Sequence, residues 1–263
     1  LSELDFKAKK SLGQNFLLDT YFTDKIAQAC APFEGCIIEI GPGPGGLTRS
    51  ILLHGANEVI AIEKDPRAIS FLETLKNAAS PRLQIKLADA LTEPIWNLGN
   101  QPRQVIANLP YNIATPLLIR WLTHSNAFDK LTLMFQKEVA DRIVAQPGQK
   151  SFSRLSVLTN WLTSSKILFE VPASAFTPKP KITSAVIQLL PRGRPLFECK
   201  FNYLEKVTQI AFNQRRKMLR ASFKKFGGAQ MLLSLNINPE LRPQELSIEN
   251  FCRLAVHLEK QIH

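Results

Sequence analysis

The sequence predicts an α/β fold: a seven-stranded, Rossmann-like sheet with helices on its faces, followed by a small helical domain. Short apolar, β-rich runs alternate with helical patterns through residue 190, which is the rhythm of a mostly parallel sheet. Glycines or polar residues come within two positions of the end of each of the first four runs, where such sheets bind ligands. Beyond a proline- and glycine-rich segment, only helical signals remain.

The strands are predicted from apolar runs bounded by turn residues. They are expected over residues 36–40, 59–62, 83–87, 104–107, 131–135, 167–171 and 185–190. Residues 191–195, Pro-Arg-Gly-Arg-Pro, are interpreted as a linker, because neither proline extends a central strand. We therefore expect domains at 1–192 and 193–263. Helices in the second are predicted over 202–213, 215–226 and 229–235, and from about residue 247.

Composition indicates an ordinary soluble protein of the cytoplasm. The hydrophobic content is 45%, no apolar run approaches the length of a membrane span, and the first ten residues do not resemble a signal peptide. The four cysteines and four histidines show no paired spacing, so neither disulfides nor a metal site is expected.

The charge is +11 and unevenly placed, with 13 basic and 6 acidic residues from Arg192 onward. An excess of this kind suits a polyanionic partner such as nucleic acid, although it serves solubility equally well.

Residues 38–48 form a predicted strand, a glycine-rich turn and a helix start, which is typical of a loop that approaches a nucleotide cofactor closely. Gly41, Gly43 and Gly46 also fit the dinucleotide fingerprint, so this motif does not separate NAD from S-adenosylmethionine. Glu63 ends the second strand and can accept from two ribose hydroxyls; the alternative is a solvated charge. Asp89 can accept from an adenine amine or simply cap a turn.

Two absences favour methyl transfer over hydride or phosphoryl transfer. No Walker-type lysine follows the glycines, and no acidic cluster is spaced to hold magnesium. A sulfonium donor needs neither, because its own positive charge activates the methyl group and the protein has chiefly to align the reactants.

The segment Asn108-Leu109-Pro110-Tyr111 closes the fourth strand and fits an adenine amine. That amine is a poor nucleophile because its lone pair is delocalised into the ring, and acceptors on its hydrogens reduce the delocalisation. The Asn108 side chain and the Leu109 carbonyl offer two acceptors, Pro110 stiffens the turn, and Tyr111 can stack on the base. An ordinary strand-to-helix turn with an Asn cap is the alternative.

Several segments together resemble the bacterial small-subunit ribosomal RNA adenine dimethyltransferases, the KsgA/RsmA type. The similarity extends from about Lys9 to Phe251. The segments that carry it are Lys-Ser-Leu-Gly-Gln-Asn-Phe-Leu at 10–17, the glycine loop at 41–46, Asn-Leu-Pro-Tyr at 108–111, Gln-Lys-Glu-Val at 136–139, Ser-Ala-Phe-Thr-Pro-Lys-Pro-Lys at 174–181 and Ala-Phe-Asn-Gln-Arg-Arg-Lys at 211–217.

The resemblance implies an S-adenosylmethionine-dependent methyltransferase without a metal. Its activity would be dimethylation of N6 in two adjacent adenosines of the hairpin near the 3′ end of 16S rRNA, late in small-subunit assembly. The partner would be a 30S assembly intermediate, and the protein is expected to be a monomer. The resemblance also implies which residues contact the cofactor. Asn15 and Leu17 would reach it from an amino-terminal lid, and Gly41 and Gly43 from the glycine loop. Glu63 would bind the ribose, Asp89 the adenine, and Asn108 would lie between the cofactor and the target amine.

Phe176 and a basic helix complete the expected RNA contacts. The resemblance makes Phe176 a second aromatic wall opposite Tyr111, which would help to hold a base taken out of its stack; the alternative is a core phenylalanine. A helix over 215–226 would direct apolar residues inward and basic residues toward rRNA phosphates, unless that face is merely solvated. The basic residues are Arg215, Arg216, Lys217, Arg220 and Lys224.

Three other functions share parts of this pattern. A macrolide-resistance methylase of large-subunit rRNA has the same core, but segments 174–181 and 211–217 weigh against it. An inactive RNA-binding assembly or transcription factor would not need Glu63, Asp89 and Asn108. A DNA adenine methylase is disfavoured because no separate base-reading module is visible.

Overall fold

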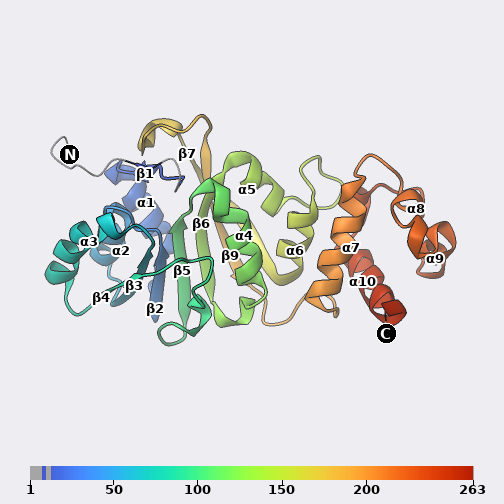
Figure 1. Ribbon diagram of the computed structural model, residues 1–263, viewed down its shortest axis with the longest axis horizontal. Coiled ribbons are helices and arrows are strands. Elements are labelled where there is room, and N and C mark those ends of the chain that lie inside the picture. Colours follow the sequence, from blue (N-terminus) through green and yellow to red (C-terminus); the bar gives the residue numbers. More distant parts are fainter. Residues whose placement is uncertain (1–7, 10–12, 263) are drawn as a thin grey trace. The chain divides into compact units, whose positions relative to one another are not determined.

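The computed structural model describes residues 8–9 and 13–262. Residues 10–12 of the amino-terminal motif therefore lie outside the described part. The chain forms two compact units, one of residues 1–140 and 166–191 and the other of 141–165 and 192–263 (Figure 1). The chain passes from the first unit to the second between residues 191 and 192, next to the expected boundary at 192/193. Residues 141–165, which we assigned to the first domain, cluster instead with the second unit, because the helix α6, Arg154–Leu162, is buried and contacts two helices of that unit.

Seven strands of the described chain form one sheet in the order β4-β3-β2-β5-β6-β9-β7. Pairing is parallel from β4 through β6 and antiparallel between β6 and β9. All seven predicted strands are present. Their bounds are β2 Cys36–Ile40, β3 Glu58–Glu63, β4 Leu83–Leu87, β5 Arg103–Asn108, β6 Lys130–Gln136, β7 Thr163–Val171 and β9 Ser184–Pro191.

The strand order reverses between β2 and β5, because the chain continues from β2 to one edge and from β5 to the other. In open α/β sheets, ligands bind beyond the carboxyl ends of the strands at such a point. Gly41 and Asn108 lie at these two carboxyl ends, so the sheet topology brings their segments together.

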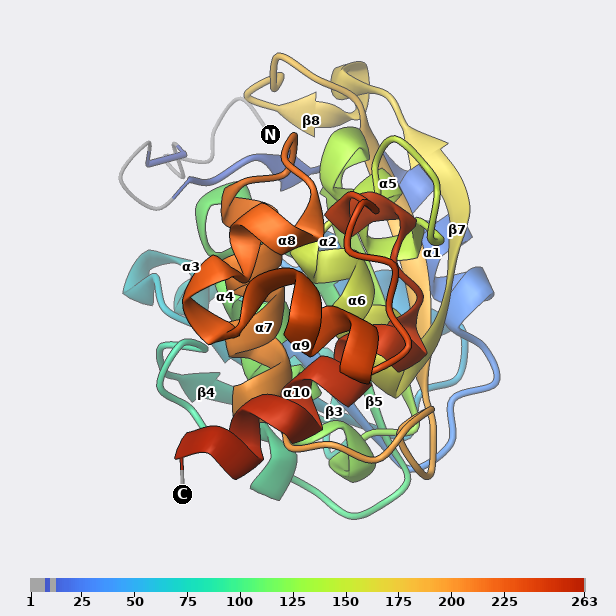
Figure 2. The same cartoon turned by 90° about the vertical axis from the view of Figure 1, so that its right-hand side faces the viewer.

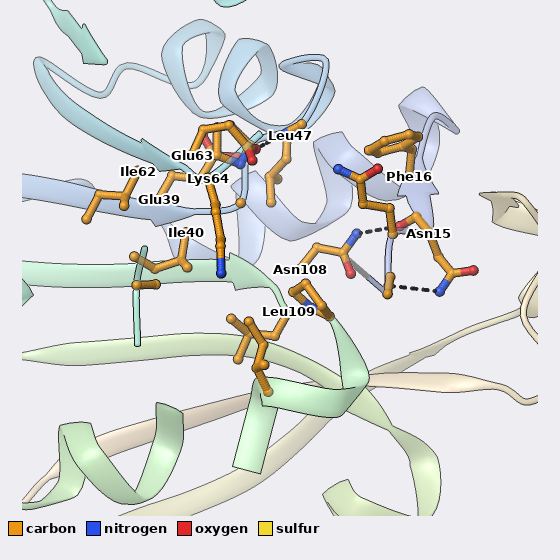
Figure 3. Close-up of a pocket in the computed structure, with 18 of the residues that line it drawn as sticks. Asn15, Phe16, Glu39, Ile40, Leu47, Ile62, Glu63, Lys64, Asn108 and Leu109 are labelled. Atoms are coloured by element: carbon orange, nitrogen blue, oxygen red, sulfur yellow. Dashed lines mark hydrogen bonds between the residues drawn. The ribbon is translucent and has the colours of Figure 1, made fainter. Parts of the chain in front are cut away.

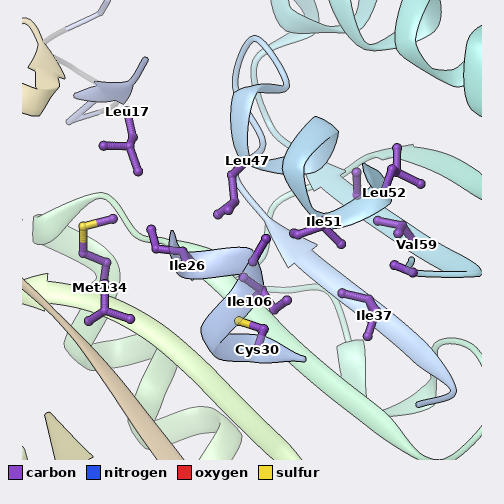
Figure 4. Close-up of a cluster of buried hydrophobic side chains, with 14 of the residues drawn as sticks. Leu17, Ile26, Cys30, Ile37, Leu47, Ile51, Leu52, Val59, Ile106 and Met134 are labelled. Carbon is purple, nitrogen blue, oxygen red and sulfur yellow. The ribbon is translucent and has the colours of Figure 1, made fainter. Parts of the chain in front are cut away.

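The helices of the first unit connect and cover the strands. Helices α1 and α2 pack together, α3 contacts β3 and β4, and α4 contacts β6. Side chains of β2 and β5, such as Ile37 and Ile106, pack with Ile51 of α2 in a core that water does not reach (Figure 4). The helices are α1 Thr20–Cys30, α2 Gly46–Leu53, α3 Pro66–Ala79 and α4 Tyr111–Leu122, with short 3₁₀ turns η2 Ile95–Asn97, η3 Ser125–Ala127 and η4 Ala173–Ala175. Helix α5, Lys137–Val144, begins in this unit and ends in the second.

Two very short strands were not predicted. β1, Phe16–Leu17, pairs antiparallel with β8, Phe176–Thr177, and the pairing places Leu17 opposite Phe176. This ladder joins the amino-terminal segment to a loop that is distant along the chain.

The second unit is mainly helical (Figure 2). Helix α7 contacts α6, α8 and α10, and α8 contacts α9. The elements are α6 Arg154–Leu162, α7 Phe201–Asn213, α8 Leu219–Ser222, η5 Lys224–Phe226, α9 Gly228–Ser234, η6 Pro243–Glu245 and α10 Ile248–Ile262. Among the described residues, no helix has both the length and the apolar character that a membrane crossing requires.

The predicted helix over 215–226 is wrong in its extent. Residues 214–217 form a turn, α8 begins only at Leu219, and residues 224–226 form a 3₁₀ turn. The backbone N–H groups of Leu219 and Arg220 donate to the carbonyls of Leu241 and Pro239. Because these long-range bonds replace bonds to the preceding turn, a continuous helix does not form.

Candidate active site

A pocket lies beyond the carboxyl ends of β2, β3, β4 and β5, at the predicted edge of the sheet (Figure 3). It is lined by residues 13–17, 39–44, 46–47, 62–64, 88–91 and 108–113. Every residue that we expected to bind the cofactor lines this pocket, as do Leu109, Pro110 and Tyr111. The structure therefore brings together residues from well-separated segments of the chain.

The glycine loop forms one wall of the pocket, and its backbone conformation would be strained by residues other than glycine. Gly41 and Gly43 have φ angles of +68° and +54°, a region that favours glycine. The Gly41 N–H donates to the Ile62 carbonyl at 2.9 Å, which holds the loop against the end of β3. A Cβ at Gly43 would lie 3.0 Å from the Phe16 ring, so the glycine also permits close packing of the amino-terminal segment.

Glu63 ends β3 and is 6% exposed. Its Oε2 accepts from the Gly43 N–H at 3.0 Å, and its Oε1 accepts from the Asp65 N–H at 2.7 Å. Burial raises the pKa of this carboxyl, whereas the backbone donors oppose the rise. A carboxylate oxygen accepts more than one hydrogen bond, so Glu63 retains acceptor capacity for a pair of hydroxyls.

Asp89 follows β4, caps a turn as its sequence position allowed, and also pairs with a lysine. Its Oδ1 accepts from the Leu91 N–H at 2.9 Å, which caps a turn, and its Oδ2 accepts from Lys64 Nζ at 2.7 Å. The Lys64 ammonium and the Leu91 N–H lower the pKa of Asp89. The carboxyl is therefore an ionised acceptor at neutral pH, within the pocket wall.

Asn108 is the last residue of β5 and points toward the amino-terminal segment (Figure 3). Its Nδ2 donates to the backbone carbonyl of Asn15 at 3.3 Å. This contact turns the amide so that Oδ1 remains available as an acceptor. Leu109 is buried, and its carbonyl accepts no hydrogen bond within the described residues. Two acceptors thus stand side by side at the strand end.

Tyr111 and Phe176 occupy different surroundings. Tyr111 lines the pocket, and its hydroxyl lies 2.7 Å from Ser184 Oγ. Phe176 is 3% exposed and belongs to the apolar core cluster with Leu17 and Met134. In this structure Phe176 therefore packs in the core, because β8 pairs with β1, whereas Tyr111 lines the pocket.

Glu39 is a pocket residue that the sequence analysis missed. It lies within β2, is 1% exposed and also lines the pocket. Burial raises its pKa to about 8; Thr48 opposes the rise and the charge of Glu63 adds to it. The sequence signal that could have identified it is an acidic residue inside an apolar strand, two positions before the glycine loop. The side chain holds its proton at neutral pH.

We predict that Glu39→Gln removes a pH dependence of stability. Between the ordinary glutamate pKa of 4.5 and about 8, the folded chain holds a proton that the unfolded chain has lost. The free energy of unfolding therefore falls as pH rises through this window. Between pH 5.5 and pH 8, urea unfolding of the wild type should lose about 3 kcal/mol more than that of Glu39→Gln. Parallel pH profiles of the two proteins would contradict the assignment.

Comparison with known proteins places this pocket in a family. The model of the family described as ribosomal RNA adenine dimethylase matches residues 5–260. The chain belongs to this family. A ribosomal RNA small subunit methyltransferase A from Paramagnetospirillum magneticum is 51% identical over 254 residues, which cover 96% of this chain and 90% of the relative. The protein of the same name from Rhodospirillum rubrum is 50% identical, with coverage of 94% and 87%.

Solved structures agree with the assignment of this adenine dimethylase. A dimethyladenosine transferase from Plasmodium falciparum has a TM-score of 0.80 and 27% identity, covering 94% of this chain and 98% of that chain. The 23S rRNA methyltransferase ErmE has a TM-score of 0.69 and 26% identity, covering 93% and 100%. The family resemblance, the enzyme class and the methyltransferase-type α/β fold that we inferred from sequence are thereby confirmed.

Proposed function

We propose that the enzyme transfers methyl groups from S-adenosylmethionine to N6 of two adjacent adenosines in the 3′-terminal hairpin of 16S rRNA. It would act as a monomer in the cytoplasm on a late 30S assembly intermediate. The observation that carries the proposal is the pair of acceptors at Asn108 and Leu109, which borders the same pocket as the glycine loop and Glu63. Family membership supports the rRNA adenine substrate.

The pocket residues fit the methyl donor. The buried Glu63 carboxylate offers acceptors for the ribose hydroxyls, and the Asp89 carboxylate offers one for the adenine amine. Leu47 and Ile62 add apolar lining, and Gly41 keeps the loop free of a side chain beside the methionine part. The sulfonium supplies an activated methyl group, so the residues around it have to position the acceptor amine rather than provide a strong base.

Asn108 and Leu109 act on the target amine. In the first transfer the Asn108 Oδ1 and the Leu109 carbonyl each accept one N6–H, and in the second transfer one of them accepts the N6–H that remains. These bonds withdraw the nitrogen lone pair from the ring and direct it toward the methyl carbon. Nitrogen then forms a bond to that carbon as the carbon–sulfur bond breaks, and the excess proton leaves to water. Pro110 keeps the turn rigid because its ring restricts φ.

Tyr111 holds the base that carries the amine. It begins α4 shortly after the two acceptors, and its bond with Ser184 stabilises the ring orientation. A flipped adenine loses its stacking partners, and an aromatic face recovers part of that loss. Phe176 as a second wall stays a prediction, which requires β8 to release its pairing with β1.

The second unit presents basic side chains for rRNA phosphates. Leu219 and Phe223 are buried, whereas Arg216, Lys217 and Arg220 are exposed. Burial thus separates these two apolar residues from these three basic ones, although the helix is short; Phe226, the third residue expected on the apolar face, is only partly buried. Arg215 is partly buried, and its guanidinium contacts the Lys150 carbonyl.

Replacing Arg216, Lys217 and Arg220 together with Gln is expected to flatten the salt dependence of rRNA binding. The loss of three phosphate contacts lowers the slope of log K against log salt by about 2 to 3. Filter binding between 50 and 300 mM KCl measures it. A variant with Arg49, Lys76 and Lys86 changed to Gln in the first unit loses equal charge and should keep the wild-type slope. An unchanged slope in the first variant would exclude these residues from the RNA surface.

Mapping of the transferred methyl groups tests both the reaction and the position of the modified nucleotides. Small subunits that lack the modification are incubated with the enzyme and radiolabelled S-adenosylmethionine, and the labelled nucleotides are mapped. Two methyl groups on each of two adjacent adenosines in the 3′-terminal hairpin are expected. Labelling of large-subunit RNA instead would favour the macrolide-resistance activity, and binding without labelling would favour an inactive assembly factor.

A further inference from the structure

Gln14 makes a long-range contact that the proposed mechanism does not use. It belongs to the segment of residues 13–17, which lines the pocket and which we call the cover segment. The Gln14 Nε2 donates to Asp65 Oδ2 at 3.0 Å, across 51 positions of sequence. Its Oε1 accepts from the Lys9 N–H at 2.8 Å. Both ends of the amide are therefore engaged, and the orientation of the side chain is determined.

Asp65 is an ionised acceptor. It is 1% exposed, yet Arg67 donates from Nε to both carboxylate oxygens, at 2.9 and 3.1 Å. Arg67 and Gln14 hold the pKa of Asp65 well below its usual range despite the opposing effect of burial. Hydrogen bonds to a charged acceptor are stronger than those between neutral groups. The bond from Gln14 is therefore a firm attachment of the cover segment to the start of α3.

The same aspartate is connected to the proposed ribose acceptor. The Asp65 N–H donates to Glu63 Oε1 at 2.7 Å, while Gly43 donates to the other oxygen. The residue that accepts from Gln14 is therefore itself hydrogen-bonded to the Glu63 carboxylate. Residues 63–65 therefore connect the proposed ribose contact at Glu63 to the cover segment through Asp65.

The rest of the cover segment spans the pocket from the glycine loop to Asn108. A Cβ on Gly43 would meet the Phe16 ring at 3.0 Å, and a Cβ on Gly46 would meet the Leu17 carbonyl at 3.2 Å. At the other side, the Asn15 carbonyl accepts from Asn108. The segment therefore contacts both the proposed donor site and the proposed catalytic amide.

We propose that Gln14 latches the cover segment over the bound methyl donor and couples its closure to the ribose contact at Glu63. Gln14 is a positioning residue, since it acts through Asp65 and Asn15 rather than on the reacting atoms. The inference rests on the proposed function of the pocket. The latch slows release of the donor.

Replacing Gln14 with Ala measures how much the Gln14–Asp65 hydrogen bond contributes to donor binding. Calorimetry and stopped-flow fluorescence with S-adenosylmethionine should show an approximately 10-fold higher Kd, carried mostly by faster dissociation, since one charge-assisted hydrogen bond is lost. The kcat at saturating donor should change less than about 3-fold. Gln28→Ala, at an exposed position of α1, is the matched control and should bind as the wild type does.

The substitution Gln14→Glu adds a second measurement, the pH dependence of donor binding, which would not change if Gln14 had a purely structural role. At pH 8 the introduced carboxylate faces the Asp65 carboxylate and repels it, so donor binding should be weaker than in Gln14→Ala. At pH 5.5 a growing fraction of the introduced carboxyl carries a proton and can donate to Asp65, which Arg67 keeps ionised. The Kd ratio of Gln14→Glu to wild type should therefore fall as pH is lowered, whereas the ratio for Gln14→Ala stays constant.

The outcomes separate the latch from the site itself. A wild-type dissociation rate in Gln14→Ala, while Glu63→Ala binds the donor poorly, overturns the latch and leaves the proposed site intact. A Gln14→Glu ratio without pH dependence likewise overturns it. A wild-type protein that binds no S-adenosylmethionine overturns both proposals. Faster dissociation in Gln14→Ala together with the pH-dependent ratio supports the latch.

Discussion

Asn108→Ala is expected to reduce methyl transfer to rRNA by at least about 10³-fold while changing the Kd for S-adenosylmethionine less than about 3-fold. The side chain acts on the amine in the transition state, so its loss appears in kcat and not in donor binding. The available Oδ1 and the Leu109 carbonyl, to which no described residue donates, locate this action at the end of β5.

Single-turnover methylation of unmodified small subunits measures the first effect, and calorimetry with the donor measures the second. Asn77→Ala removes an exposed amide from α3 and is the matched control. Turnover at the wild-type rate in Asn108→Ala would overturn the proposed mechanism. A large rise in donor Kd would instead assign Asn108 to cofactor binding.

Glu63→Ala is expected to raise the Kd for S-adenosylmethionine about 100-fold or more. Two hydroxyl hydrogen bonds to a buried carboxylate are lost, each worth about 1.5 to 3 kcal/mol. Glu34→Ala, at an exposed position, is the control for removal of a carboxylate. Because Glu63 also accepts from Gly43 and Asp65, the melting temperature of the variant has to be compared with that of the wild type.

A ligand series separates the ribose contact from damage to the loop. S-adenosylhomocysteine and its 2′-deoxy analogue should differ strongly in affinity for the wild type and little for Glu63→Ala. Such coupling arises only where the carboxylate and the hydroxyl interact. Equal losses in both proteins would show that Glu63 does not contact the ribose.

The sheet was predictable because its signals are local. Apolar runs such as residues 36–40 and 131–135 are buried strands, and observed bounds differ from predicted ones by at most a few residues. The two-residue strands β1 and β8 carry no periodicity, so only their mutual pairing defines them. The helix expected over 215–226 was interrupted for the same reason, since distant carbonyls take the N–H groups of Leu219 and Arg220.

The candidate site was predictable as a set of strand-end residues but not as a network. Parallel strands gather their carboxyl ends at one edge, so Gly41, Glu63, Asp89 and Asn108 had to lie near one another. Nothing local distinguished Phe176 as a core residue from Phe176 as a wall of the base site, and only its pairing opposite Leu17 buries it in this structure.

By itself the sequence determined the family, the seven strands and the chemical groups at their ends, because periodicity and motif spacing are properties of neighbouring residues. Only the tertiary structure decided which groups touch. Gln14 reaches Asp65 across 51 positions and Asn108 reaches Asn15 across 93, and burial gives Glu39 its raised pKa. Contacts and solvation of this kind depend on how distant segments pack, which no local pattern encodes.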